Sequence, residues 1–284
     1  MEILIVVIVL LLFLCFYSSL WNCEGFTSDV IKDLVKFNGR KPGTLDHYES
    51  HLYLLNKVRS LNVQEVSWAP GYVQKFEYQG IPHQNIVFKL PGKLTSPKII
   101  VMAHYDHIGI GYPGGNDNGS GVFGLLKIAE RLSHLSETQG LFYPILFILT
   151  DGEETGMKGS RIIFDQEPIG NVVINIDTIG GFPDNKPIPI ASKYNYAHFL
   201  SNQAKKKNMD IIHIDIKPGR SDITHFLKTN ICVEFGYPTK EGHYHSHNDT
   251  YENLYLNNMN KVIDLAGDLV EGLSKGYLSG QFKW

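Results

Sequence analysis

The stretch PKIIVMAHYDH at residues 97–107 carries the strongest structural signal in the chain. Its first seven residues form an unbroken apolar, β-branched run, which is typical of a strand buried on both faces of a sheet. Polar residues follow this run at once, beginning with His104. Because ligands of open α/β sheets bind at the carboxyl ends of the strands, the stretch predicts a central strand that ends at a functional site.

Further strands and helices surround this segment. Apolar strand-like runs lie at 143–150, 171–176, 211–216 and 230–235, and two more strand-like segments lie at 74–78 and 85–90. A polar helical stretch covers 27–58, and apolar residues recur at helical spacing from Val122 to Leu132 and from Val262 to Leu273. Alternating strands and amphipathic helices predict an α/β fold with three αβα layers and a mostly parallel, mixed central sheet.

Composition limits the class of protein. The 284 residues are 43% hydrophobic and 19% charged, which is typical of a globular chain. A formal net charge of −3 argues against a nucleic-acid partner. Of the three cysteines only Cys232 lies beyond the N-terminal region, so a disulfide scaffold is excluded. We expect a single domain over residues 25–284.

Residues 1–24 are interpreted as a targeting segment. An unbroken apolar run extends from Ile3 to Tyr17, and the first basic residue is Lys32. About 20 apolar residues are enough to span a bilayer as a helix. The segment is either a membrane anchor or a cleaved signal peptide, and the lack of a clear small-x-small cleavage site favours the anchor. We therefore expect the rest of the chain to be extracytoplasmic, membrane-anchored or secreted.

Acidic side chains follow the predicted strands. Glu153 and Glu154 lie just after the strand at 143–150, and Asp177 follows the strand at 171–176. Asp117 lies in the segment NDNGSG (116–121) just before a helix. Each motif alone is explained by a solvated turn or a helix cap. Adjacent carboxylates at the end of a buried strand are nevertheless unfavourable unless a cation offsets their charge.

Histidines complete the set of candidate ligands. His104 and Asp106 are two residues apart, so on an extended chain Asp106 can accept a hydrogen bond from a metal-bound His104. A second group of histidines lies in HYHSHNDT at 243–250. Any single histidine there is explained as a solvated loop residue, and we expect that explanation to hold for His243 and His247.

Together these motifs resemble the co-catalytic zinc aminopeptidases of peptidase family M28. The motifs are AHYDH at 103–107, NDNGSG at 116–121, DGEETG at 151–156, NID at 175–177 and HSHNDT at 245–250. They follow the family's order, and the likeness covers roughly residues 80–275. The resemblance implies a zinc-peptidase fold of the phosphorylase/hydrolase-like type. It also implies a cis peptide bond between Asp117 and Asn118.

The resemblance further implies two Zn²⁺ ions and a role for each site residue. It implies five ligands, one pair for each ion and one bridging residue: His104 with Asp177, Glu154 with His245, and Asp117 between them. Glu153 is implied as the general base that activates a metal-bridged water, and Asp106 as the residue that orients His104. The activity implied is removal of the N-terminal residue from peptide substrates. Tyr237 and Tyr244 both remain candidates for stabilising an oxyanion.

Three alternatives compete with the aminopeptidase. Glutaminyl cyclase shares the fold but binds one zinc and releases ammonia. Against it, the complete five-ligand set is present and residues 155–160 resemble the short peptidase loop. A carboxypeptidase or deacylase of the M20 type usually carries a second domain, for which this chain has no room. A binding module that has lost catalysis should also have lost ligands, and none is missing here.

Overall fold

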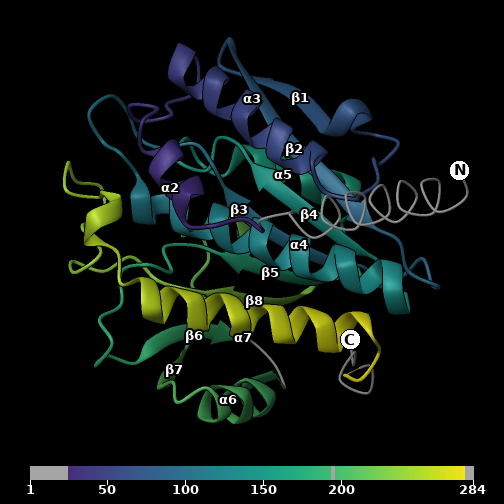
Figure 1. Ribbon diagram of the computed structural model, residues 1–284. Helices are drawn as coiled ribbons and strands as arrows, with labels where there is room; N and C mark the ends of the chain where they lie inside the picture. The colour runs from purple at the N-terminus through teal and green to yellow at the C-terminus, as the bar shows by residue number, and fades with distance from the viewer. Residues whose placement is uncertain (1–24, 193–195, 279–284) are drawn as a thin grey trace, which may run out of the picture.

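A mixed sheet forms the centre of the molecule (Figure 1), whose computed structural model describes residues 25–192 and 196–278. Within these ranges the sheet has eight strands in the order β1-β2-β4-β3-β5-β8-β6-β7. Their bounds are Val73–Tyr78 (β1), Ile81–Leu90 (β2), Ile99–His104 (β3), Ile145–Thr150 (β4), Val172–Ile176 (β5), Ile188–Ser192 (β6), Ile211–Ile214 (β7) and Ile231–Phe235 (β8). The mixed α/β sheet that the sequence predicts is confirmed.

Parallel pairing places the carboxyl ends of four central strands at the same edge of the sheet. Strand β3 lies between β4 and β5 and runs parallel to both, and β5 runs parallel to β8. Antiparallel pairs join β1 to β2, β2 to β4 and β6 to β8, while β6 and β7 are parallel. The carboxyl ends of β3, β4, β5 and β8 therefore lie side by side.

Helices cover both faces of this sheet, as Figure 1 shows. The face in front carries α2, α3, α4 and α7, with bounds Asp29–Leu34, Leu45–Arg59, Gly121–Gln139 and Leu256–Ser274. Helix α5 (Lys158–Gln166) packs behind the sheet, and α6 (Tyr196–Lys206) contacts α7 and β7. These layers match the three-layer αβα arrangement expected from the sequence.

Side chains of the central strands alternate between the two layers. In β3, Ile99, Val101 and Ala103 belong to the core under α4 and α7, whereas Ile100 and Met102 belong to the core under α5. All six residues of β3 are buried. This burial on both faces explains why the sequence shows an unbroken apolar run instead of polar–apolar alternation.

The helical stretch expected over residues 27–58 is interrupted. Helix α2 ends at Leu34 and α3 begins only at Leu45. Gly39 and Gly43 in the connection have φ angles of 94° and 86°. A Cβ at Gly39 would lie 1.6 Å from the carbonyl oxygen of Gly109, so the turn requires glycine.

The predicted membrane anchor or signal peptide at residues 1–24 lies outside the described residues. Along residues 25–192 and 196–278, no helix is long and apolar enough to cross a membrane.

Candidate metal centre

The five ligands expected from the sequence gather at the carboxyl ends of the central strands. His104 is the last residue of β3, and Asp177 directly follows β5. Asp117 lies in the helical turn Gly115–Ser120, which precedes α4. Glu154 lies in the turn after β4, and His245 lies in the loop after β8. Helix α4 joins β3 to β4 on one face of the sheet and α5 joins β4 to β5 on the other, so the strand order reverses at β3, where α/β sheets bind ligands.

Asp117 lies at the centre of the group. Its Oδ1 is 3.3 Å from His104 Nε2, and its Oδ2 is 3.1 Å from His245 Nε2. His104 Nε2 is also 3.5 Å from Asp177 Oδ1, and His245 Nε2 is 3.1 Å from Glu154 Oε1. The two oxygens of one carboxylate therefore face two separate groups of potential ligands.

His107 joins the second group, which the sequence analysis did not anticipate. Its Nδ1 lies 3.1 Å from Glu154 Oε1 and 3.9 Å from Asp117 Oδ2. The side chain is fully buried, and its Nε2 has no hydrogen-bond partner among the described residues. His107, Asp117 and Glu154 bring ligand atoms within 4.8 Å of one another, as do His104, Asp117 and Asp177. The signal in the sequence was its place at the end of the AHYDH motif.

The residues of both groups fit zinc. Asp117 Oδ2 and Asp177 Oδ1 are buried and lack a hydrogen-bond partner within the described part of the chain. Burial raises the pKa of Asp177 above its usual value, although the nearby His104 lowers it. Such carboxylates need a cation to offset their charge. Zinc binds histidine nitrogen and carboxylate oxygen, and these are the donors present.

Asp106 holds the turn that carries the two glutamates. Its Oδ1 accepts a hydrogen bond from the backbone N–H of Glu153 at 3.1 Å, and its Oδ2 accepts one from the N–H of Glu154 at 3.2 Å. The carboxylate also lies 3.7 Å from His104 Nδ1, which is 3.2 Å from the backbone oxygen of Asp106. Orientation of His104 by this carboxylate stays a prediction, and the contact with the glutamate turn is new.

Two further residues hold the segment that carries Asp117. Asp249 accepts hydrogen bonds from the backbone N–H of Asn116 at 2.6 Å and of Asp117 at 3.0 Å. Arg40, which is fully buried, donates to the backbone oxygens of Tyr105 and Gly114 at 2.8 and 2.9 Å. The peptide bond between Asp117 and Asn118 is cis, as the resemblance implied.

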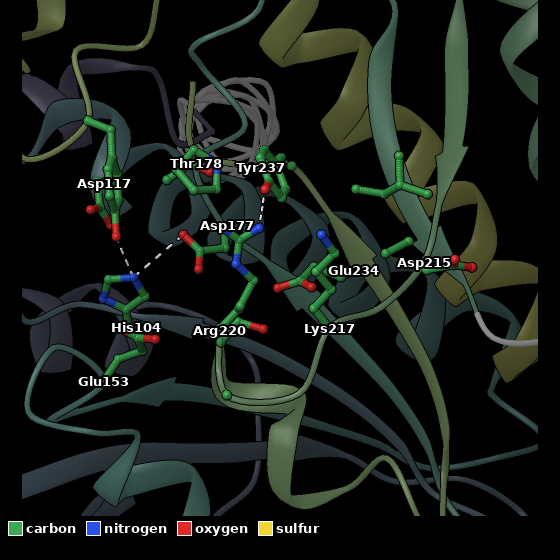
Figure 2. A pocket seen from close by; sticks show the side chains of 17 residues that line it. His104, Asp117, Glu153, Asp177, Thr178, Asp215, Lys217, Arg220, Glu234 and Tyr237 are labelled. Atoms are coloured by element: carbon green, nitrogen blue, oxygen red, sulfur yellow. Dashed lines mark hydrogen bonds and ion pairs between the residues drawn. The ribbon is translucent and has the colours of Figure 1, made fainter. Parts of the chain in front are cut away.

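A cavity of about 270 Å³ opens beside the metal ligands. Figure 2 shows His104, Asp117, Glu153 and Asp177 along one side of it. Tyr244 lines the same cavity, and its ring stacks on His245 with centroids 3.8 Å apart. Tyr237 also lines it, and its hydroxyl accepts a hydrogen bond from Arg220. Both tyrosines thus remain candidates for contacting the substrate.

His247 and His243 lie apart from the ligand groups. His247 Nδ1 is 2.6 Å from the backbone oxygen of Gly111, and its ring stacks on Tyr112 with centroids 4.3 Å apart. His245 Nε2, by contrast, lies 3.1 Å from both Asp117 Oδ2 and Glu154 Oε1. The histidine that faces the site is His245.

A profile of peptidase family M28 matches residues 85–270, which is more than half of the chain. The chain belongs to peptidase family M28. It is 35% identical over 104 residues to the aminopeptidase YwaD of Bacillus subtilis and 31% identical over 91 residues to leucine aminopeptidase 1 of Trichoderma harzianum. These matches cover 34% and 29% of this chain, but only 22% and 23% of the relatives.

Solved structures show how this M28 chain compares in three dimensions. A zinc aminopeptidase from Bacillus subtilis matches with a TM-score of 0.60 and 25% identity, covering 70% of this chain and 52% of that one. The LapA aminopeptidase of Legionella pneumophila matches with a TM-score of 0.71 and 19% identity, covering 88% and 70%. Glutaminyl cyclase from Porphyromonas gingivalis matches with a TM-score of 0.66 and 21% identity, covering 88% and 100%. The last two likenesses show the fold alone.

Proposed function

We propose that this M28 chain is a metallo-aminopeptidase that binds two zinc ions and removes the N-terminal residue from peptides. The observation that carries the proposal is the position of Asp117. Its Oδ1 lies 3.3 Å from His104 Nε2, and its Oδ2 lies 3.1 Å from His245 Nε2. One carboxylate between two groups of ligands is the arrangement that two ions close together require.

The candidate ligands form two groups, one for each ion. His104 and Asp177 would hold one zinc, and Glu154 and His245 would hold the other, with Asp117 shared. Zinc, when bound, polarises a substrate carbonyl and lowers the pKa of water, so that peptide hydrolysis becomes feasible at neutral pH. No cysteine takes part, which suits a catalytic site with open positions better than a closed structural one.

Glu153 is the residue that moves the proton. Its side chain lines the cavity beside His104, Asp117 and Asp177. Burial raises the pKa of Glu153 well above its usual value, although the charge of His104 opposes this. A carboxylate with a raised pKa is a better base. Glu153 would take a proton from the attacking water and pass it to the nitrogen of the leaving amine.

Glutaminyl cyclase is the alternative that an experiment must exclude. This chain covers the whole length of the Porphyromonas gingivalis enzyme but less than a quarter of the curated aminopeptidases that it matches. In favour of the aminopeptidase, all five residues of the family's ligand set are present in this chain. Their side chains lie together around Asp117.

The test combines zinc content with product analysis. The purified chain is loaded with zinc, its bound metal is measured by elemental analysis, and it is assayed on aminoacyl arylamides and on a peptide with N-terminal glutamine. We expect two zinc ions per chain, release of the free N-terminal amino acid, and loss of activity with a chelator. One zinc per chain together with ammonia and a pyroglutamyl product would identify a cyclase instead.

A further inference from the structure

Glu234 is a carboxyl group in a strand that is otherwise apolar. Strand β8 reads ICVEF, and its other four residues are buried. Asn175 on β5 and Ala191 on β6 are the cross-strand neighbours of Glu234. Asp177 follows Asn175 by two residues, so this metal ligand and Glu234 lie on the same face of the sheet.

The Glu234 side chain reaches the cavity that contains the metal ligands. Residues at one end of this cavity are His104, Asp117 and Asp177, and Glu234 lines it further along the sheet. In the view of Figure 2 the Arg220 side chain comes between Asp177 and Glu234, with its guanidinium turned to the Tyr237 hydroxyl. We take a peptide whose first carbonyl lies at the candidate metal ligands to extend its first side chain along this cavity toward Glu234.

This carboxyl group is only partly satisfied by the protein. Asn175 Nδ2 donates a hydrogen bond to Glu234 Oε1 over 3.3 Å. No Lys, Arg or His of the described residues forms an ion pair with Glu234. Burial raises the pKa of Glu234 to about 7, although a hydrogen bond with Ser221 opposes the rise. A half-buried carboxyl that accepts so few hydrogen bonds favours a polar partner and disfavours an aliphatic one.

The charges around the cavity disfavour an ionised substrate side chain. Lys217 and Arg220 line the same cavity from the segment after β7, and Asp215 lies in that segment as well. The cavity therefore offers charges of both signs, and neither a cationic nor an anionic side chain would meet only opposite charge. A neutral side chain with an N–H donor avoids both repulsions and can hydrogen-bond to Glu234.

We propose that Glu234 selects substrates whose N-terminal residue has an uncharged, hydrogen-bond-donating side chain, such as glutamine or asparagine. This inference rests on the proposed aminopeptidase function, because it takes the cavity to be the binding site for the first side chain. The preference distinguishes amides from aliphatic residues of equal size.

Pairs of nearly isosteric substrates test the proposal directly. Glutaminyl and methionyl arylamides differ little in size, and so do asparaginyl and leucyl arylamides. With the zinc-loaded wild type we expect kcat/KM for each amide to exceed that of its apolar counterpart by at least about tenfold. The Glu234→Met variant should reverse this order, and Glu234→Gln should largely keep it. Free arylamine is measured together with ammonia, so that cyclisation of the glutaminyl substrate is not counted as hydrolysis.

A matched control and the wild-type ratios make the result decisive. Glu137→Gln alters an exposed carboxylate on α4, outside the cavity, and should leave both ratios unchanged. Activity of Glu234→Met on the methionyl substrate reports that the variant is folded. Equal or better hydrolysis of the leucyl and methionyl substrates by the wild type would overturn this inference alone. Absence of arylamine release from all four substrates would overturn the proposed function as well.

Discussion

Glu153 and Glu154 are adjacent in the sequence but face different partners. Glu154 Oε1 lies 3.1 Å from both His107 Nδ1 and His245 Nε2, within the second ligand group. Glu153 instead lines the cavity where substrate would bind. One hydrogen-bond acceptor, the Asp106 carboxylate, holds the backbone N–H of both residues and keeps the turn fixed. Neighbouring residues of one turn are thus assigned two separate tasks.

Replacing each glutamate by glutamine separates these tasks. Glu153→Gln keeps the shape but removes the base, so it should retain both zinc ions while kcat falls by about 10²–10⁴-fold. Glu154→Gln replaces an anionic ligand by a weak neutral one and should lose zinc as well as activity. Elemental analysis alongside kcat decides between them. If Glu153→Gln is the variant that arrives without zinc, the two assignments are reversed.

The histidines of the last motif are distinguished in the same way. His245→Ala should lose one zinc ion and nearly all activity, because its Nε2 faces both Asp117 and Glu154. His247→Ala should keep both ions, since that side chain contacts Gly111 and Tyr112 instead. Zinc content is the readout, and circular dichroism checks that both variants fold. Loss of zinc in His247→Ala would show that the second ligand lies elsewhere in the motif.

At the scale of elements, the sequence predicted what depends on local pattern. The strands β3, β4, β5 and β8 were found because burial on both faces requires continuous apolar runs. Strand β6 was not predicted, because its sequence IPIAS contains proline and is only partly buried. Strand β7 ends at Ile214, short of the expected 216, since it pairs with β6 alone.

The residues of the site likewise separate into those that a local pattern predicts and those that it does not. Its candidate ligands could be proposed from the sequence because each follows a predicted strand or lies in a motif with a characteristic order. The contributions of His107, Arg40 and Asp249 depend on packing between distant segments, which no local pattern reveals. Arg40, for example, lies 65 residues before the carbonyl of Tyr105 to which it donates a hydrogen bond. Glu234 was not singled out from the sequence, because residues 230–235 were interpreted only as a buried strand.

Asp151 joins three elements next to the metal centre. It follows β4, and its Oδ1 lies 2.9 Å from His47 Nε2 of α3 and 3.3 Å from His83 Nδ1 of β2. Its Oδ2 accepts a hydrogen bond from the backbone N–H of Gln84 at 2.7 Å. Burial by itself raises the pKa of Asp151, but hydrogen bonds with the two histidines lower it to about 2.

This pKa predicts how stability depends on pH. Since the pKa of Asp151 is lower in the folded state than the usual value of about 3.9, its contribution is present above pH 4 and is lost as pH falls toward 2. At pH 7 Asp151→Asn should lower the free energy of unfolding by about 2 kcal/mol. Urea unfolding of the zinc-free wild type and variant at several pH values measures the difference. A difference that does not narrow below pH 4 would contradict the assignment.

At the scale of the whole molecule, zinc would connect most of the fold. Its expected ligands come from the ends of β3, β4 and β5, from the turn before α4 and from the loop after β8. Without a cation, the buried Asp117 lies close to the carboxylate of Asp177 in one group and to that of Glu154 in the other. Because the unfolded chain cannot hold these residues together, zinc binding should stabilise the folded state as a whole.

The slope of the free energy of unfolding against the logarithm of the free zinc concentration therefore reports how many ions bind. When both sites are nearly saturated, each tenfold rise in free zinc should add about 1.4 kcal/mol per bound ion to the free energy of unfolding. Two ions predict a total of about 2.8 kcal/mol per tenfold, and one ion predicts half of that. Urea unfolding in zinc buffers measures this slope without relying on catalysis. Asp117→Asn, which weakens the residue shared by both groups, should reduce the slope, and a wild-type slope of one ion would rule out the two-zinc site.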